Sequence, residues 1–147
     1  MNTSCNTITI FKIEDFTQQV INGNLVLTRI NPFIEECTLF QKDLRGSVII
    51  DCKINNEFVD VKKYKKLLLI LYSTTDVETI LQNTILNISK QEIYEKGFEY
   101  YNQLGLSIQG SDARRTLKEI IIFLKLKSYN MDLTIKLKSD ETVRFMI

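Results

Sequence analysis

Alternating apolar and polar residues predict a β-hairpin in the first half of the chain. Residues 47–54 and 57–61 alternate in this way and flank Asn55-Asn56. Asparagine tolerates positive φ, so the pair predicts a two-residue turn. The resulting register places four apolar side chains on a face that we expect to be buried: Ile50 opposite Val61, and Cys52 opposite Val59.

A second hairpin is predicted over residues 131–147, around Ser139-Asp140-Glu141. A two-residue loop would oppose Ile135 to Arg144. A three-residue loop instead gives one wholly apolar face, and we therefore expect it. That face would hold three cross-strand pairs: Leu137 with Val143, Ile135 with Phe145, and Leu133 with Ile147.

The rest of the chain contains further segments of both kinds. Runs of β-branched and aliphatic residues predict strands at 7–13, 25–30 and 65–73, and a short extended piece at 106–109. Apolar spacing and start and stop signals predict helices at 14–22, 33–44, 76–87, 90–104 and 112–128. Residues 119–127 also have strong β propensity, so a strand is the alternative there.

Local signals support the predicted helices. Asn31-Pro32 offers an N-cap followed by the favoured first residue. Two capping boxes precede later helices: Thr75-x-x-Glu78 and Ser89-x-x-Glu92. Together the elements predict one α+β domain over residues 1–147. We expect antiparallel hairpins at about 47–61 and 131–147, packed with three to five helices.

Composition places this domain in a reducing compartment away from membranes. The 147 residues are 44% hydrophobic and 25% charged, which is typical of globular proteins. The three cysteines have no CxxC spacing, and the first residues do not resemble a signal peptide. The longest apolar runs are too short to span a bilayer. We therefore expect a cytoplasmic protein, and the abundance of Ile, Asn and Lys hints at a viral or phage source, in the host cytoplasm or a virion.

The sequence lacks the residues that most enzymes use. Histidine is absent, which removes the commonest general base and metal ligand. No glycine-rich phosphate loop is present, and no base is available to activate Cys5, Cys37 or Cys52. Asp51 and Asp60 would repel each other across the first hairpin, but Lys53 and Lys62 can neutralise them without a cation. We expect no catalytic residue, metal or cofactor.

Two basic segments are candidate contacts for nucleic acid or an acidic partner. Residues 1–61 carry five Lys/Arg and eight Asp/Glu, whereas residues 62–147 carry fourteen and ten. The first candidate comprises Lys62, Lys63, Tyr64, Lys65 and Lys66, where lysines could hold phosphates and the ring could stack on a base. A solvated strand edge that blocks aggregation explains this segment equally well and is our preferred interpretation.

The second candidate lies on the helix predicted to run to about residue 128, with either Ser111 or Asp112 as its N-cap. It comprises Arg114, Arg115, Lys118 and Lys125, with free backbone amides near residues 111–113 that could bind an anion. Asp112 already places a negative charge there, so a capped amphipathic helix is the simpler interpretation. A further group is expected to share one face of the helix at 90–104 and to pack in the core: Tyr94, Phe98 and Tyr101, with Tyr100 off the stripe.

The absence of recognisable catalytic and metal-binding residues favours a non-enzymatic interaction or structural module, with a protein partner or self-association. A nucleic-acid-binding accessory protein that uses the basic second half is the alternative. An enzyme based on carboxylates such as Asp51, Asp60 or Asp112 ranks third, because no spacing singles these residues out.

Overall fold

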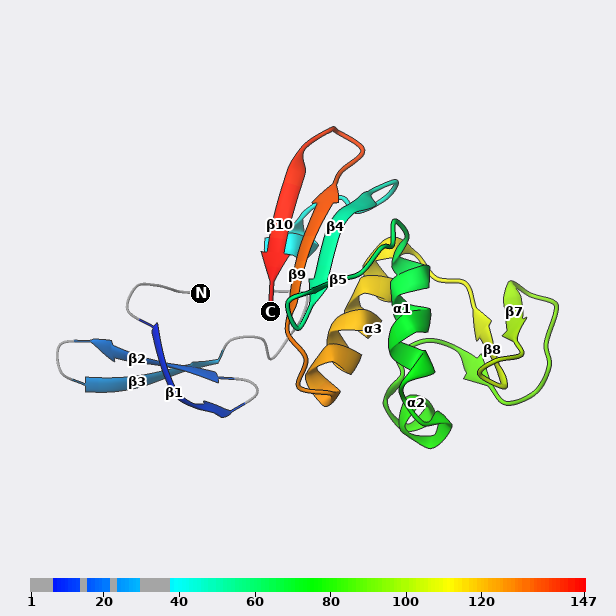
Figure 1. Ribbon diagram of the computed structural model, residues 1–147, viewed down its shortest axis with the longest axis horizontal. Helices are drawn as coiled ribbons and strands as arrows, with labels where there is room; N and C mark the ends of the chain where they lie inside the picture. The colour runs from blue at the N-terminus through cyan, green and yellow to red at the C-terminus, as the bar shows by residue number, and fades with distance from the viewer. Residues whose placement is uncertain (1–6, 14–15, 22–23, 30–37) are drawn as a thin grey trace. The chain divides into compact units, whose positions relative to one another are not determined.

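The computed structural model describes residues 7–13, 16–21, 24–29 and 38–147, with side chains from residue 39 onward (Figure 1). The chain divides into two units, residues 1–42 and 43–147. Antiparallel strands and α-helices occur together, which confirms the α+β class. One domain over the whole chain stays a prediction.

The first unit contains a three-stranded antiparallel sheet. Its order is β1 (Thr7–Ile13), β2 (Phe16–Ile21) and β3 (Asn24–Arg29). The strands predicted at 7–13 and 25–30 are confirmed, and the helix predicted at 14–22 is wrong because β2 occupies it. β-branched and aromatic residues favour extended backbone there. The helix predicted at 33–44 falls partly outside the described residues, and the 3₁₀ helix η2 (Thr38–Gln41) lies within its range.

A four-stranded antiparallel sheet dominates the second unit. Its strands are β4 (Val48–Ile54), β5 (Glu57–Phe58), β9 (Met131–Lys136) and β10 (Thr142–Met146), in the order β10-β9-β4-β5. The predicted turn is confirmed, because Asn55 and Asn56 have φ of 52° and 67°. The two edge strands differ greatly in length, since β5 has two residues and β10 has five.

The C-terminal hairpin is confirmed, but its register is two residues from the predicted one. Ile135 lies opposite Val143, and Leu133 lies opposite Phe145. The loop has three residues, as predicted, but it comprises residues 138–140 and not 139–141, because the Leu137 N–H donates to the Glu141 carbonyl at 2.8 Å. A shift of two residues preserves which side chains share a face, so the apolar face is as predicted.

A β-bulge changes the face on which Ile50 lies. The pairing of β4 with β9 shifts between Ile49 and Asp51, so Ile50 is an extra residue on β4. Ile49 and Cys52 are 3% and 0% exposed, whereas Ile50 is 51% exposed. The prediction that Ile50 is a core residue is therefore wrong.

Two helices pack side by side in this unit. α1 spans Tyr64–Ser73, where a strand was predicted, and α3 spans Ala113–Leu126. The buried residues of α1 fall at helical spacing: Tyr64, Leu67, Leu68, Leu71 and Tyr72. The prediction failed because Leu69 and Ile70 fill the run, and an unbroken apolar run does not distinguish strand from helix.

The predicted start of α3 is confirmed, and that of α2 is one residue off. Asp112 caps α3 by accepting the Arg115 N–H at 2.8 Å. α2 (Val77–Asn83) begins after Asp76, whose carboxylate accepts the Thr79 N–H, and not after Thr75. It also ends four residues earlier than predicted, at Asn83.

The helix predicted at 90–104 is wrong. The segment contributes to a three-stranded antiparallel sheet of order β6-β8-β7, formed by β6 (Ile88–Ser89), β7 (Phe98–Tyr101) and β8 (Leu106–Gln109). Lys96 and Gly97 have φ of 57° and 81°, which a helix does not allow. The Ser89 hydroxyl accepts the Gln91 N–H in a local turn and caps no helix. The extended piece predicted at 106–109 is confirmed as β8.

The core of the second unit is built from the two helices and the inner face of the four-stranded sheet. In Figure 1, α1 and α3 stand between this sheet and the β6-β8-β7 sheet. The Tyr72 and Phe123 rings meet edge to face, with centroids 5.3 Å apart. The sheet contributes six buried side chains: Ile49, Cys52, Met131, Leu133, Ile135 and Leu137.

Candidate functional site

The outer face of the four-stranded sheet carries exposed apolar side chains. Because Leu133 and Ile135 point into the core, the residues that alternate with them and their cross-strand neighbours point outward. Four large apolar side chains of this sheet are between 45% and 64% exposed: Val48, Ile50, Phe58 and Met146. They come from β4, β5 and β10 and surround a charged centre. We call this surface, with its charged centre, the outer face.

Charged residues occupy the centre of the outer face. The Arg144 guanidinium on β10 donates two hydrogen bonds to Asp132 on β9, at 2.9 and 2.6 Å. This contact holds the pKa of Asp132 below its usual value, and Lys53 on β4 adds to the effect. The apolar side chains therefore surround a paired, ordered group of charges.

The expected opposition of Asp51 and Asp60 does not form within the sheet. β5 ends at Phe58, so Asp60 lies beyond the ladder, while Asp51 lies opposite Thr134 on β9. In the part of the chain that the structure describes, no group of three or more Cys, Asp or Glu residues is placed to hold a metal ion.

The first basic candidate surrounds the start of α1. Its lysines flank a helix and not the predicted strand edge. Tyr64 is 7% exposed, and its hydroxyl lies 2.6 Å from that of Ser47, so the ring is not available to stack on a base. Lys65 pairs with Glu99 at 2.9 Å. The exposed lysines outside this ion pair are Lys62, Lys63 and Lys66.

The residues of the second basic candidate do not act together, because Arg115 has a structural role that the other three do not share. The Arg115 guanidinium donates through both Nε and a terminal nitrogen to the Ile85 carbonyl, with the Nε bond at 3.1 Å. It therefore holds the segment after α2. The other three are half-buried on a flank of α3: Arg114, Lys118 and Lys125. Ile121, which lies among these three on the helix, is fully buried.

A buried carboxylate that sequence reasoning missed lies on the same helix. Glu119 is 0% exposed and accepts three hydrogen bonds, from the Tyr72 hydroxyl, the Thr84 hydroxyl and the Ile85 N–H at 2.9 Å. No lysine or arginine among the described residues forms an ion pair with it. Burial, together with this carboxylate, raises the pKa of Tyr72. The sequence signal was a single acidic residue among the apolar positions of α3.

Glu119 and Arg115 together fix the backbone of one residue, Ile85. They lie four residues apart and so share a face of α3. Instead of pairing with each other, Glu119 accepts the Ile85 N–H and Arg115 donates to the Ile85 carbonyl. Both backbone groups of Ile85 are thereby satisfied away from regular secondary structure. The arrangement is structural, since the Glu119 carboxylate and both backbone groups of Ile85 have protein partners.

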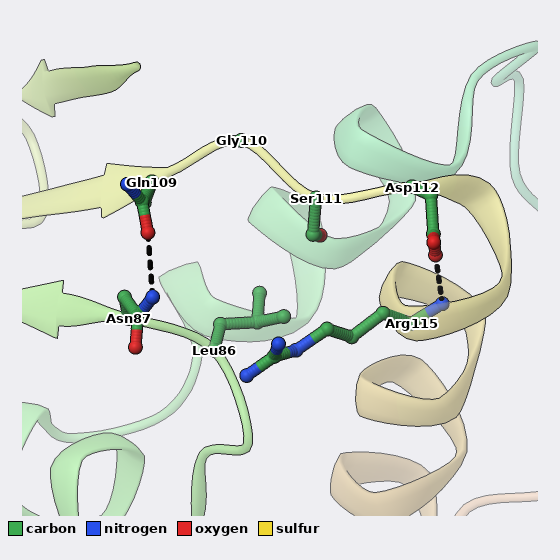
Figure 2. Close-up of a pocket in the computed structure, with 7 residues that line it drawn as sticks. All are labelled: Leu86, Asn87, Gln109, Gly110, Ser111, Asp112 and Arg115. Atoms are coloured by element: carbon green, nitrogen blue, oxygen red, sulfur yellow. Dashed lines mark hydrogen bonds between the residues drawn. The ribbon is translucent and has the colours of Figure 1, made fainter. Parts of the chain in front are cut away.

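A small cavity of about 160 Å³ lies beside this peptide, at the start of α3 (Figure 2). Its polar side chains are mostly engaged with one another. Asn87 donates to the Gln109 side chain, and Asp112 caps the helix, as the dashed lines in Figure 2 show. Ser111 bonds to Thr116 at 2.7 Å. The cavity holds one carboxylate, Asp112, which opposes an anion at this helix start.

The remaining candidates from the sequence are the cysteine on β4 and the predicted aromatic stripe. Cys52 is fully buried, and burial raises the pKa of its thiol to about 11, which is the opposite of an activated nucleophile. The predicted aromatic stripe belongs to no helix, and so that prediction is wrong. Tyr94 lies in a loop, 71% exposed, with its ring 6.1 Å from that of Tyr100.

Comparison with known proteins found no matching family model, no matching curated protein and no matching solved structure. The described helices include none that is long and apolar enough to cross a membrane.

Proposed function

We propose that the protein is a non-enzymatic interaction module whose outer face binds a protein partner. The observation that carries this proposal is the exposure of Val48, Ile50, Phe58 and Met146 on one sheet. Single exposed apolar residues are ordinary on protein surfaces, whereas several on one face are typical of contact surfaces. Phe58 is 64% exposed on a two-residue strand, where its side chain contributes little to the core.

Photo-crosslinking tests this proposal. A benzophenone amino acid at Phe58 would report on the outer face, and the same group at Tyr94 is a matched control, because Tyr94 is an equally exposed aromatic residue outside this sheet. We expect a light-dependent adduct with a second protein at Phe58 alone, in cells that naturally make the protein. Equal adducts at both positions, or none at Phe58, would refute the proposal.

Nucleic-acid binding by the lysines around α1 is the second candidate. Its support is the exposure of Lys62, Lys63 and Lys66 on a segment without an acidic residue in the first helical turn. Such binding should weaken steeply with salt, because lysines that neutralise phosphates release counterions. Fluorescence anisotropy with labelled oligonucleotides at low salt tests it, with the triple Lys→Gln variant as the control. Equal signals from both proteins would remove this candidate.

A further inference from the structure

Among the described strands of the unit 43–147, none pairs with the β10 edge of the four-stranded sheet. Met131 on β9 bonds to Ile147, and Leu137, which directly follows β9, bonds to Glu141, so every second residue from 141 to 147 faces β9. Val143 and Phe145 belong to that set by alternation. The backbone N–H and C=O groups of Thr142, Arg144 and Met146 consequently point away from β9. In the unit 43–147, no described strand pairs with them.

The two edges of this sheet are protected to different degrees. β5 is two residues long and pairs with β4, a strand that carries a bulge at Ile50, and short strands and bulges are the usual defences against edge pairing. β10 has five residues, a regular register with β9 and no proline. Its one charged side chain, Arg144, is tied to Asp132 on the outer face. The charge of Arg144 therefore does not prevent another strand from pairing with the β10 edge.

The inner side of β10 is also incompletely covered. Val143, Phe145 and Ile147 continue the apolar inner face of β9 but are only half-buried, whereas Leu133 and Ile135 are 0% and 1% exposed. A strand added to the edge would extend the sheet and cover these side chains. The occupant must therefore present an apolar inner side and backbone groups of its own.

A second copy of β10 meets both needs in one antiparallel register. With the two-fold axis at Phe145, the two Phe145 rings are neighbours and Val143 lies beside the other copy's Ile147. On the outer side, Arg144 of each copy lies opposite Met146 of the other. A two-fold axis at Arg144 would oppose two guanidinium groups, which is destabilising. An axis at Val143 would place Phe145 opposite Glu141. Of these three registers, the first alone pairs only apolar side chains on the inner side and opposes no like charges.

We propose that the chain forms a two-fold symmetric dimer by antiparallel pairing of β10 with β10 of a second copy, centred on Phe145. This inference deepens the proposed function, on which it rests, by naming a second copy as a partner at the sheet edge. The two sheets become one continuous sheet of eight strands, and the outer faces of both copies become contiguous. Four backbone hydrogen bonds join Arg144 and Met146 across the axis.

Proline substitutions on the open edge test the register. Met146→Pro removes an outward-pointing N–H that the pairing uses twice by symmetry, and leaves the bonds between β9 and β10 intact. Thr142→Pro is the matched control, because Thr142 also points outward but lies outside the pairs that residues 143–147 form in this register. By sedimentation equilibrium of the full chain, we expect dimers for the unchanged protein and Thr142→Pro. Met146→Pro should raise the dimer Kd by about tenfold or more.

Charge variants at Met146 keep the test valid if the proline variants do not fold. Met146→Glu would face Arg144 of the second copy and tighten the dimer, whereas Met146→Arg would loosen it. Within one copy, Met146 lies opposite Asp132, which favours the arginine variant. The expected order of dimer affinity is therefore the reverse of the expected order of monomer stability. A trend in dimer affinity that follows monomer stability would overturn the proposal.

Other outcomes are equally decisive. A protein that stays monomeric at millimolar concentration overturns the dimer, and so does a dimer that Thr142→Pro disrupts and Met146→Pro spares. Neither result bears on a crosslink from Phe58 to another protein, because Phe58 lies on the opposite edge strand of the sheet. The failure of the dimer and the failure of the outer face as a contact surface are thus distinguishable.

Discussion

The hydrogen bonds to Glu119 should make a large contribution to the stability of the unit 43–147. They join α3 to α1 through Tyr72 and to the segment after α2 through Thr84 and Ile85. A hydrogen bond to a charged group contributes about 1.5–3 kcal/mol to the free energy of unfolding. Tyr72→Phe removes one such bond and leaves the ring in place against Phe123. We expect it to lower the free energy of unfolding by about 1.5–3 kcal/mol.

The partner substitution is Glu119→Gln, which keeps the volume of the side chain. Its amide oxygen can still accept the Ile85 N–H, but its amide nitrogen can only donate to the two hydroxyls, so neutral bonds of reversed direction would replace the charge-assisted ones. We expect a loss of about 2–4 kcal/mol from the charge-assisted bonds that disappear. The Tyr72→Phe/Glu119→Gln double variant should lose about 1 kcal/mol less than the sum of the single losses, because both remove the same bond.

Urea unfolding followed by circular dichroism measures these free energies. Tyr64→Phe is the matched control: it is also a buried tyrosine of α1, but its hydroxyl meets the neutral hydroxyl of Ser47. We expect it to lower the free energy of unfolding by about 1 kcal/mol and to be additive with Glu119→Gln. If Tyr72→Phe and Glu119→Gln each changed stability by less than about 0.5 kcal/mol, the network would not stabilise the fold as argued.

Two further predictions follow from the same unit. Gly46 has φ of +71°, so Gly46→Ala should lower the free energy of unfolding by about 1 kcal/mol in urea titrations. Gly110 has no positive φ, so Gly110→Ala should change this free energy by less than about 0.5 kcal/mol. Equal losses from the two substitutions would contradict the role of backbone strain. Burial raises the pKa of the Cys52 thiol to about 11, so little thiolate is present at pH 8. Iodoacetamide should therefore modify Cys52 only when urea unfolds the protein, and mass spectrometry of the Cys52 peptide measures this. Rapid modification of the folded protein would contradict the burial of Cys52.

The strongest local signals were enough to predict several elements. Two asparagines in succession predicted the turn at residues 55–56, and Asp112 ahead of an amphipathic stripe predicted α3. α1 was missed because its apolar residues also fill positions outside the buried stripe. β7 was missed because the apolar residues of 90–104 repeat at helical spacing, whereas Lys96 and Gly97 take positive φ values that a helix does not allow. Periodicity does not report where the chain must take a positive φ.

The candidate site was harder to predict, since it depends on contacts between distant segments. Arg115 was a candidate contact for nucleic acid or an acidic partner, and the structure shows it donating to the Ile85 carbonyl, thirty residues away in sequence. Tyr64 was a candidate for stacking on a base, and the structure shows it buried with its hydroxyl against Ser47. Glu119 was missed because a single acid in an apolar run has no local partner to reveal it. Each of these side chains satisfies a polar group that only the tertiary fold brings near.

The prediction for Ile50 failed in a different way from the prediction for α1. In α1 the predicted element was wrong, yet apolar residues of that segment are still buried. At Ile50 the strand was right and the burial was wrong, because one extra residue on β4 turns an isoleucine outward. A regular strand would have avoided this exposure by losing one residue. A residue that breaks the usual rule of burial without stabilising the fold is expected at a functional surface. The bulge therefore gives the outer face an apolar residue that a regular β4 would not expose, which is an independent physical reason to look for a partner there.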